Sequence, residues 1–406
     1  MPGPGRIGFV TTSFPKHSGD ASGSFVFELA RALVRSGHTV EVVVPEPAVP
    51  ADWDHDFDWL RGVRVHGAPY MRPRRLQKLF FGAGVPDNIS RNPILAGLVP
   101  PALFGLLAQT ARRARRWDAL VSHWLVPSAL ISGLARKRDT RHLAIAHSAD
   151  VHLLGHLPLG RILASAALRG ADHMGFVTGG LRDEFLSLLA PTAAVDALKR
   201  SSVTPMGVDM DALAQRKSGD DVREDLGLDK FTVLFLGRLV PIKGVDLLID
   251  AAIGASGIQI VIAGDGPERE RLEKRASERG IDARFLGWIG PERRADLLGA
   301  CDAVAVPSRV LQNGRHEGLP LVVLEALGAG CPVIAAASGG ISEIIEDDVS
   351  GFLVPPGDVD ALHSAMMKLK LNPDISRCLS IAGRKRAEVR DWNALVPIYE
   401  ELILGV

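Results

Sequence analysis

The stretch IGFVTTSFPKHSGDASGSFVFELARALVRSGHTVEVVVP, residues 7–45, decides how the chain begins to fold. Two short apolar runs, 7–11 and 38–45, flank a segment, 25–36, whose apolar residues recur with helical spacing. Short apolar runs bounded by glycine and polar turns are typical of buried strands, and the helical pattern indicates an amphipathic helix that ends at Gly37. A strand, a helix and a second strand in this order predict a βαβ unit, which starts a parallel sheet.

The same alternation continues along the chain and begins again at Phe231. In the second half the predicted strands are FTVLFLGR, IQIVIAG, ARFLG, AVAVPS, CPVIAA and GFLVPP, and helices are expected to begin near Gly244, Pro267, Pro291, Pro320 and Ile341. The turn-rich and then polar segment 201–221 separates the two series. We therefore predict an α/β protein made of two doubly wound parallel-sheet domains that face each other across a cleft. Ligands of such sheets bind beyond the carboxyl ends of the strands.

Composition is that of a soluble two-domain protein. The 406 residues are 47% hydrophobic and 23% charged, and Lys+Arg and Asp+Glu both number 47, so net charge gives no indication of a nucleic-acid partner. The three cysteines are scattered without a CxxC pair, which suggests reduced thiols in a cytoplasmic protein. We expect no signal peptide at the N-terminus and no span in the apolar run 94–108, which is short and contains Pro100-Pro101.

One segment departs from this balance. Residues 61–116 hold eleven Lys and Arg and one acidic residue, and RPRRLQKLFF (72–81) mixes basic with large apolar side chains. One interpretation is a solvated surface hairpin. The other is a face that rests on anionic lipid at the inner side of a membrane, where each basic residue contributes about 1 kcal/mol.

Glu325 stands out because it lies in the apolar helix predicted from Pro320 to Gly328. Unpaired carboxylates are costly in such surroundings. Pro320 suits the first position of a helix, so Leu321 and Val322 are expected to offer free backbone N–H groups where the helix dipole is positive. This is an anion site, and phosphate fits it. Glu325 could accept the hydroxyls of a ribose, or it could be a buried glutamate satisfied by backbone N–H groups or by an arginine.

A second anion site is expected upstream, in FLGRLVPIKGVDLLIDA (235–251). Arg238 ends a strand and Lys243 precedes a helix, and two cations at such a turn suit a diphosphate. Together the two sites indicate a nucleoside diphosphate ligand.

At this point the sequence resembles the retaining glycosyltransferases of family 4, which have the GT-B fold of two Rossmann-like domains. The resemblance covers nearly the whole chain and is carried by GRLVPIKG (237–244), IAGDGPERERLE (262–273), the run 317–358, SHWLVPSALISGLA (122–135) and AHSADVHLL (146–154). It implies an N-terminal acceptor-side domain, 1–205, a nucleotide-sugar domain, 206–385, and a C-terminal helix, 386–406, that packs back on the first domain.

The resemblance also implies roles for individual residues. Arg238 and Lys243 would hold the donor diphosphate, Glu317 the donor sugar and Glu325 the ribose. The Trp288-Ile289 backbone would flank the base, and the remaining residues implied on the donor side are Gly23, Gly318, Leu321 and Val322. His147 would face the donor sugar, whereas His123 and Asp150 are acceptor-side candidates. The family pattern often reads His-Gly-Ser-Asp where this chain has His-Ser-Ala-Asp (147–150), a departure that bears on the acceptor pocket.

The function expected is transfer of a sugar, with retention, from a UDP- or GDP-sugar to a hydroxyl of a glycan, a lipid-linked or a small-molecule acceptor. No cofactor and no metal are expected. Asp-x-Asp triplets, which bind metal in other glycosyltransferases, occur at 54–56, 56–58, 209–211 and 358–360, too often to be informative. The alternatives are a sugar-nucleotide 2-epimerase of similar architecture and a non-catalytic nucleotide-sugar-binding protein.

Overall fold

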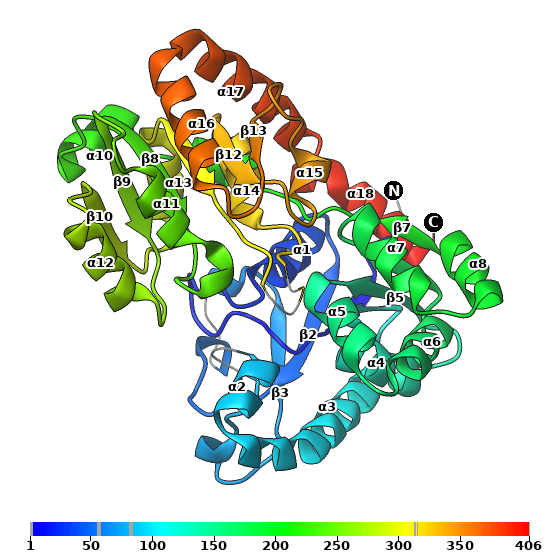
Figure 1. Ribbon diagram of the computed structural model, residues 1–406. Coiled ribbons are helices and arrows are strands. Elements are labelled where there is room, and N and C mark those ends of the chain that lie inside the picture. The colour runs from blue at the N-terminus through cyan, green and yellow to red at the C-terminus, as the bar shows by residue number, and fades with distance from the viewer. Residues whose placement is uncertain (1–2, 55–57, 81–83, 312–313, 315, 406) are drawn as a thin grey trace. The chain divides into compact units, whose positions relative to one another are not determined.

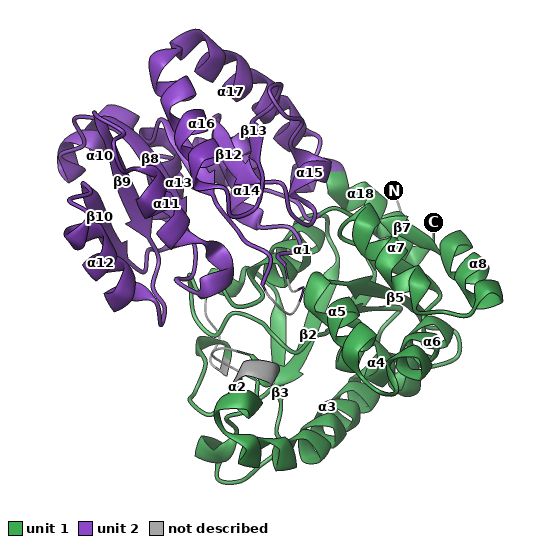
Figure 2. Ribbon diagram, in the orientation of Figure 1, with its two compact units in different colours: residues 1–205, 395–406 green, residues 206–394 purple. Residues whose placement is uncertain are grey.

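A computed structural model describes residues 3–54, 58–80, 84–311, 314 and 316–405. The chain divides into two compact units (Figure 2). Unit 1 comprises residues 1–205 and 395–406, and unit 2 comprises residues 206–394. The second division falls inside the last helix, α18 (Trp392–Leu404), rather than at the expected residue 386.

Unit 1 is built on a seven-stranded sheet in the order β3-β2-β1-β4-β5-β6-β7, and every neighbouring pair is parallel. The strands are β1 (Arg6–Val10), β2 (Thr39–Pro45), β3 (Arg64–Ala68), β4 (Ala119–His123), β5 (Arg141–Ala146), β6 (His173–Phe176) and β7 (Ser201–Val203). The α-helices are α1 (Ser24–Arg35), α2 (Val85–Arg91), α3 (Val99–Ala114), α4 (Leu130–Ala135), α5 (Ser148–His156), α6 (Gly160–Gly170), α7 (Gly179–Ser187) and α8 (Pro191–Lys199) (Figure 1).

The segment 61–116 is a structural part of unit 1 and not the predicted hairpin. It supplies the edge strand β3 and the helix α3, which packs against β2, β3 and α4. Between them Arg74–Leu76 form a single 3-10 turn, and Leu79 and Phe80 are buried in a small apolar cluster. Phe81, the last residue of the predicted basic and apolar run, lies outside the described residues.

Pro100 and Pro101 do not interrupt the helix, contrary to our expectation. A 3-10 helix, Pro93–Leu98, leads directly into α3, and the prolines occupy the first turn of α3, where their missing N–H groups have no intrahelical acceptor to bond. The helical segment Pro93–Ala114 is therefore long and apolar enough to cross a membrane by length and composition. Its buried side packs within unit 1, so we treat it as a helix of that unit.

Unit 2 repeats the same plan with six parallel strands in the order β10-β9-β8-β11-β12-β13. Its strands are β8 (Phe231–Leu236), β9 (Ile258–Ala263), β10 (Ala283–Gly287), β11 (Ala303–Val306), β12 (Val333–Ala336) and β13 (Phe352–Val354). Its α-helices are α9 (Met210–Ala214), α10 (Gly219–Leu226), α11 (Val245–Ala251), α12 (Arg269–Glu278), α13 (Pro291–Ala300), α14 (Leu321–Gly328), α15 (Ile341–Ile344), α16 (Val359–Leu371) and α17 (Pro373–Glu388), followed by the start of α18.

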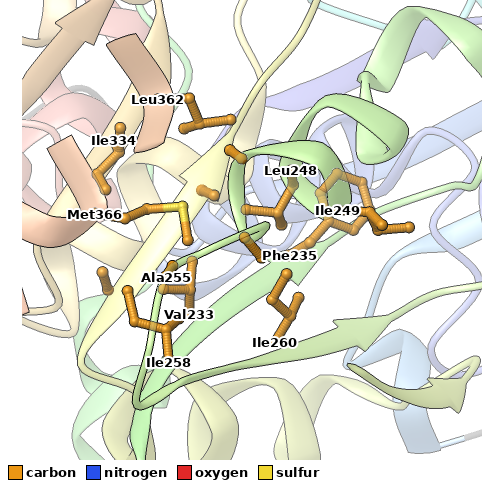
Figure 3. Close-up of a cluster of buried hydrophobic side chains, with 14 of the residues drawn as sticks. Val233, Phe235, Leu248, Ile249, Ala255, Ile258, Ile260, Ile334, Leu362 and Met366 are labelled. Carbon is orange, nitrogen blue, oxygen red and sulfur yellow. The ribbon is translucent and has the colours of Figure 1, made fainter. Parts of the chain in front are cut away.

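One face of the unit 2 sheet is covered by a continuous apolar cluster. Side chains of β8 and β9 such as Val233 and Ile260 meet Leu248 of α11 and Met366 of α16 on one face of the sheet (Figure 3). These residues have almost no exposed surface, so the apolar runs in the sequence are buried strands, as predicted. The rigid sheet fixes where the loops beyond its strand ends stand.

Helix α18 returns the chain to unit 1. The Tyr399 hydroxyl lies 3.3 Å from the Pro205 carbonyl oxygen, and Oε1 of Glu400 lies 3.0 Å from Nε2 of His38. Both ends of the chain therefore belong to unit 1 (Figure 1).

Candidate active site

The neighbouring strands β8 and β11 mark the point where the strand order of unit 2 reverses. In doubly wound sheets a ligand binds beyond the carboxyl ends of the strands at this point. Arg238 and Lys243 lie in the loop that follows β8, and Glu317 lies in the connection from β11 to α14. Sequence and topology therefore point to the same edge of the sheet.

Glu317 is held by two side chains at this edge. Nζ of Lys243 forms an ion pair with its Oε1, and the Ser308 hydroxyl donates to its Oε2 at 2.5 Å. Ser308 is fully buried directly beyond β11. Sequence reasoning missed Ser308, although a polar residue at the end of the run AVAVPS was the available signal. The ammonium group of Lys243 and the carboxylate of Glu317 therefore lie side by side at the carboxyl ends of β8 and β11.

Gly244 fixes the position of Lys243. It follows the 3-10 turn Pro241–Lys243 with φ of 65°, and a Cβ at this position would lie 2.0 Å from the Pro307 carbonyl oxygen. Only glycine combines a left-handed conformation with so close an approach of two backbones. Arg238, by contrast, is exposed, and its side chain makes no hydrogen bond or ion pair with the described residues. Its guanidinium is available to a ligand.

The start of α14 has the geometry expected of an anion site, with one correction. Pro320 is the residue before the helix, with ψ of 119°, and not its first residue. The Val323 N–H donates to the Pro320 carbonyl at 3.0 Å, whereas the N–H groups of Leu321 and Val322 have no acceptor among the described residues. Gly318 precedes this turn, and its carbonyl accepts the Gly340 N–H at 2.7 Å. Two N–H donors therefore remain for an anion.

Glu325 has an arginine partner. Nη1 of Arg294, in the first turn of α13, donates to Oε1 of Glu325 at 2.7 Å, and the two side chains are 23% and 19% exposed. The cost of burying the Glu325 carboxylate is therefore offset by Arg294 within the protein. This is the alternative in which an arginine satisfies a buried glutamate. A partner on another helix leaves no local signal in the sequence.

The loop between β10 and α13 carries the residue expected beside the base. Ile289 is buried, whereas the neighbouring Trp288 is 55% exposed. The Ile289 side chain thus anchors this loop in unit 2, and the Trp288 ring lies at the surface.

In unit 1, Gly23 begins α1 with φ of 67°, and a Cβ here would lie 2.3 Å from the Ser13 carbonyl oxygen. The glycine-rich turn therefore lies against the loop after β1. Strands β1 and β4 are adjacent and mark the reversal of strand order in this unit, so this turn lies at its switch point.

His123, the last residue of β4, and His147, directly after β5, form a buried pair at the carboxyl ends of the strands of unit 1. Nδ1 of His123 lies 3.2 Å from Nε2 of His147, and the ring of Phe25 in α1 is centred 4.7 Å from that of His147. Burial lowers the pKa of His147 to about 3 and holds the pKa of His123 well below its usual range. Both imidazoles are therefore neutral near pH 7, and they interact with each other.

Asp150 is engaged by backbone groups. Its Oδ2 accepts the Leu125 N–H at 2.6 Å and its Oδ1 accepts the His147 N–H at 2.9 Å. Burial raises the pKa of Asp150 to about 7, although these hydrogen bonds oppose the shift. The side chain thus ties the loop after β4 to the start of α5 and positions His147.

Two of the Asp-x-Asp triplets serve as helix caps. Asp209 accepts the Ala212 N–H at the start of α9, and Asp358 accepts the Ala361 N–H at the start of α16. The other two triplets share Asp56, which lies outside the described residues. Within the described part of the chain, no group of three or more His, Cys, Asp or Glu is arranged to hold a metal ion.

The predicted residues are thus brought together in three sets. Lys243 contacts Glu317, Glu325 contacts Arg294, and His123 contacts His147, which Asp150 supports. The first two sets are held in unit 2 and the third in unit 1.

Family profiles match both halves of the chain. The profile described as "Glycosyl transferases group 1" matches residues 219–386, and the one described as "Glycosyl transferase 4-like domain" matches residues 21–199. Each match falls within one structural unit.

Two relatives illustrate the similarity in sequence. A GDP-mannose-dependent alpha-(1-6)-phosphatidylinositol monomannoside mannosyltransferase of Mycolicibacterium smegmatis is 35% identical over 69% of this chain and 74% of its own length. A D-inositol 3-phosphate glycosyltransferase of Saccharomonospora viridis is 34% identical over 94% of this chain and 90% of its own length.

Solved structures share the fold. HepE of Anabaena, in complex with UDP, is 19% identical with a TM-score of 0.74, over 99% of this chain and 100% of that one. Sucrose-phosphate synthase of Thermosynechococcus elongatus is 23% identical with a TM-score of 0.76, over 98% of both chains.

Proposed function

This chain belongs to the family 4 glycosyltransferases of group 1 and has their GT-B fold, and from that premise we propose its donor, its acceptor and the course of its reaction. It moves a sugar from a nucleoside diphosphate sugar to an acceptor hydroxyl. The proposed donor is GDP-mannose, and the proposed acceptor carries an inositol phosphate. The two relatives named above support this, because one is GDP-mannose-dependent and both names contain inositol in phosphorylated form. The relatives are transferases, so the epimerase alternative is not pursued.

The observation that carries the donor site is the grouping of cations and N–H donors at the switch point of unit 2. Arg238, Lys243 and the N–H groups of Leu321 and Val322 would neutralise the diphosphate. Lys243 would turn from Glu317 toward the phosphates. The Glu317 carboxylate, still held by Ser308, would then exchange the ammonium for a hydroxyl of the donor sugar.

The reaction would proceed with retention and without a metal ion. The acceptor oxygen would attack the anomeric carbon on the face from which the diphosphate departs. As the bond from that carbon to the phosphate oxygen breaks, the acceptor proton would pass to the diphosphate. Catalysis would then consist of positioning and of stabilising the charge of the leaving group.

A donor and acceptor screen tests this function. Melting curves of the full chain are recorded with GDP, UDP and their sugars, since a ligand at 100 times its Kd adds about 2.7 kcal/mol. GDP-mannose is then incubated with phosphatidylinositol mannosides and with inositol phosphates, and the anomeric configuration of the product is read by NMR. We expect GDP-mannose to stabilise the protein and an α-linked mannoside to form. Transfer from UDP-sugars alone would refute the donor, and binding without any transfer would favour a non-catalytic binding protein.

We further propose that unit 1 rests on anionic lipid at the cytoplasmic face of a membrane through α3 and its flanks. One side of α3 packs within unit 1. The opposite side, together with the residue that follows the helix, exposes Phe104, Ala108, Arg112 and Arg115. Phe104 is 72% exposed, and Ile94 in the preceding 3-10 helix is 85% exposed. Large apolar side chains next to arginines suit the boundary between lipid headgroups and acyl chains.

Vesicle flotation tests the lipid contact. Phe104→Glu and Ile94→Glu should reduce binding to phosphatidylglycerol vesicles about tenfold, since each removes an apolar anchor and adds a repelled charge. Ile381→Glu, at a position of α17 that is 55% exposed in unit 2, is the matched control. Unchanged flotation of both Phe104→Glu and Ile94→Glu would exclude this face.

A further inference from the structure

The ion pair between Arg294 and Glu325 joins two helices that both begin near the proposed donor site. Arg294 lies in the first turn of α13 and Glu325 in the second turn of α14. Nη1 of Arg294 and Oε1 of Glu325 are 2.7 Å apart, within the range of a strong charge-assisted hydrogen bond. Both side chains remain about one fifth exposed, so the pair is accessible from one side.

Only one oxygen of Glu325 is used. Its hydrogen bond with the described residues goes through Oε1, and Oε2 accepts none from them. The residues of α14 three and four positions from Glu325 are Leu321, Val322 and Gly328, so the helix itself offers no polar side chain that would orient the carboxylate. The rotamer of Glu325 therefore depends on Arg294.

Helix α13 also carries the loop expected to flank the base. It begins at Pro291, directly after the segment that contains Ile289, and the Arg294 N–H closes its first turn on the Gly290 carbonyl at 3.0 Å. The side chain of Arg294 thus connects the base loop to the carboxylate expected to bind the ribose.

We propose that Arg294 is a positioning residue for the donor: it holds the Glu325 carboxylate so that the second oxygen accepts the ribose hydroxyls. This inference rests on the proposed function and on the contact between Glu325 and the donor ribose that the family resemblance implies. A carboxylate with one oxygen fixed by an arginine and the other open can accept two adjacent hydroxyls without changing rotamer. The donor then meets a carboxylate that is already oriented, which lowers the entropy lost on binding.

Two other roles for Arg294 make different predictions. A purely structural bridge between α13 and α14 would affect stability without affecting how the protein distinguishes nucleotides. A direct contact with the phosphates or the base would affect every nucleotide alike. Only a positioning role affects recognition of the ribose hydroxyls specifically.

The experiment compares nucleotides with and without those hydroxyls. Calorimetric titration of the full chain with GDP, UDP and their 2′,3′-dideoxy analogues gives the ratio of dideoxy Kd to ribonucleotide Kd. The variants are Arg294→Gln, Arg294→Lys, Glu325→Gln and the double variant of the two glutamine substitutions. Arg293→Gln is the control, because Arg293 is exposed, adjacent and equal in charge, and makes no side-chain contact described in the structure. Melting curves verify that each variant is folded.

We expect Arg294→Gln to lower the ratio about three- to tenfold by weakening ribonucleotide binding, as loss of a charge-assisted hydrogen bond implies, with dideoxy binding unchanged. Arg294→Lys should keep part of the wild-type ratio, and the control Arg293→Gln should keep all of it. The double variant should have the same ratio as Glu325→Gln alone, because Arg294 then has no carboxylate to hold. A wild-type ratio in Arg294→Gln, or equal weakening of both nucleotide types, would overturn the proposal. If Glu325→Gln itself kept the wild-type ratio, the assignment of Glu325 to the donor ribose would fail, while the proposed transfer from a GDP-sugar would still be judged by the donor and acceptor screen. If Glu325→Gln changed the ratio and Arg294→Gln did not, Glu325 would bind the ribose without help from Arg294, and the positioning role of Arg294 would be refuted.

Discussion

Two glutamates of one segment show how single residues are prepared for a ligand. Glu317 is bound by an ammonium and a hydroxyl, and Glu325 by a guanidinium. Both carboxylates are mostly buried, so their charges would be costly without these partners. The protein thus offsets the cost of burying both carboxylates. Arg238, by contrast, forms no ion pair with a carboxylate of the described residues.

Arg238 therefore offers the cleanest test of leaving-group stabilisation. Arg238→Ala should lower kcat by roughly 10²–10³, as for other lost preorganised donors, while its free energy of unfolding changes by less than about 0.5 kcal/mol. Steady-state kinetics and melting curves measure the two effects. Arg293→Ala is the control for loss of an exposed positive charge. Near-normal turnover in Arg238→Ala would remove this residue from the diphosphate site.

Asp150 predicts a pH dependence of stability. Its pKa is about 7 in the folded protein and near 3.8 when unfolded, so between these values the folded state binds more protons and Asp150 makes stability fall as pH rises. Burial also lowers the pKa of His147 to about 3 and that of His142, a fully buried residue of β5, to about 4. These two histidines make stability rise with pH between roughly pH 4 and 6.5, opposite to Asp150.

The variant Asp150→Asn separates these contributions. It should cost about 1–3 kcal/mol, because an amide has one acceptor oxygen for the N–H groups of Leu125 and His147. The cost should be largest at about pH 4 and below, where wild type keeps most or all of the contribution from Asp150, and smaller at pH 8. Urea unfolding at both pH values measures this difference. A cost that grows with pH would show that Asp150 is ionised well below pH 7.

At the scale of elements, the loops between strand ends and helix starts carry the candidate site. The Gly244 turn brings Lys243 to β11, and the residues before α14 bring Glu317 to the same place. Helix α3 has a buried side and an exposed side because its buried residues recur every four positions. The buried residues are Ala102, Leu106, Thr110 and Ala114, and the proposed lipid-facing residues lie on the other side.

Gly244→Ala should disturb the donor loop more than an ordinary loss of glycine would. Gly254→Ala is the matched control, because Gly254 has φ of 75° and no atom within 4 Å of an added Cβ, whereas Gly244 has φ of 65° and the Pro307 carbonyl at 2.0 Å. Each substitution costs about 1–2 kcal/mol for the left-handed backbone. Only Gly244→Ala should also lower the affinity for GDP, as read by calorimetry. Equal effects of the two variants on stability and affinity would mean that the Pro307 contact does not position Lys243.

At the scale of the whole molecule, the chain uses one Rossmann-like plan twice, and each unit has its own switch point. Unit 2 presents cations, N–H donors and carboxylates there, and unit 1 presents neutral histidines. This contrast agrees with a donor domain that neutralises a diphosphate.

Full activity is predicted in excess EDTA, because Arg238, Lys243 and the start of α14 supply the positive charge that a metal ion would otherwise provide. Asp209 and Asp358 are occupied as helix caps, which is a further reason. Initial rates with and without EDTA, and after addition of Mn²⁺ or Mg²⁺, measure this. Activity lost in EDTA and restored by either ion would show that the charge of these residues is not sufficient.

The sequence by itself determined most of the alternation of strands and helices in both units, and it predicted the candidate residues of the donor loops. These features are local, since apolar runs, prolines and glycines define strands and helix starts wherever they occur. It did not reveal the edge strands β3 and β7, whose partly exposed residues give no apolar run. Nor did it show that the prolines of α3 lie in a continuous helix.

Only the tertiary structure decided which side chains meet. Arg294 reaches Glu325 from another helix, Ser308 reaches Glu317 from the end of a strand, and the ring of His123 pairs with that of His147. Such contacts depend on the stacking of strands and the packing of helices, and residues distant in sequence carry no periodic signal of their pairing. The sequence therefore predicted which segments carry the candidate site, and the packing within each unit set the hydrogen bonds among their side chains.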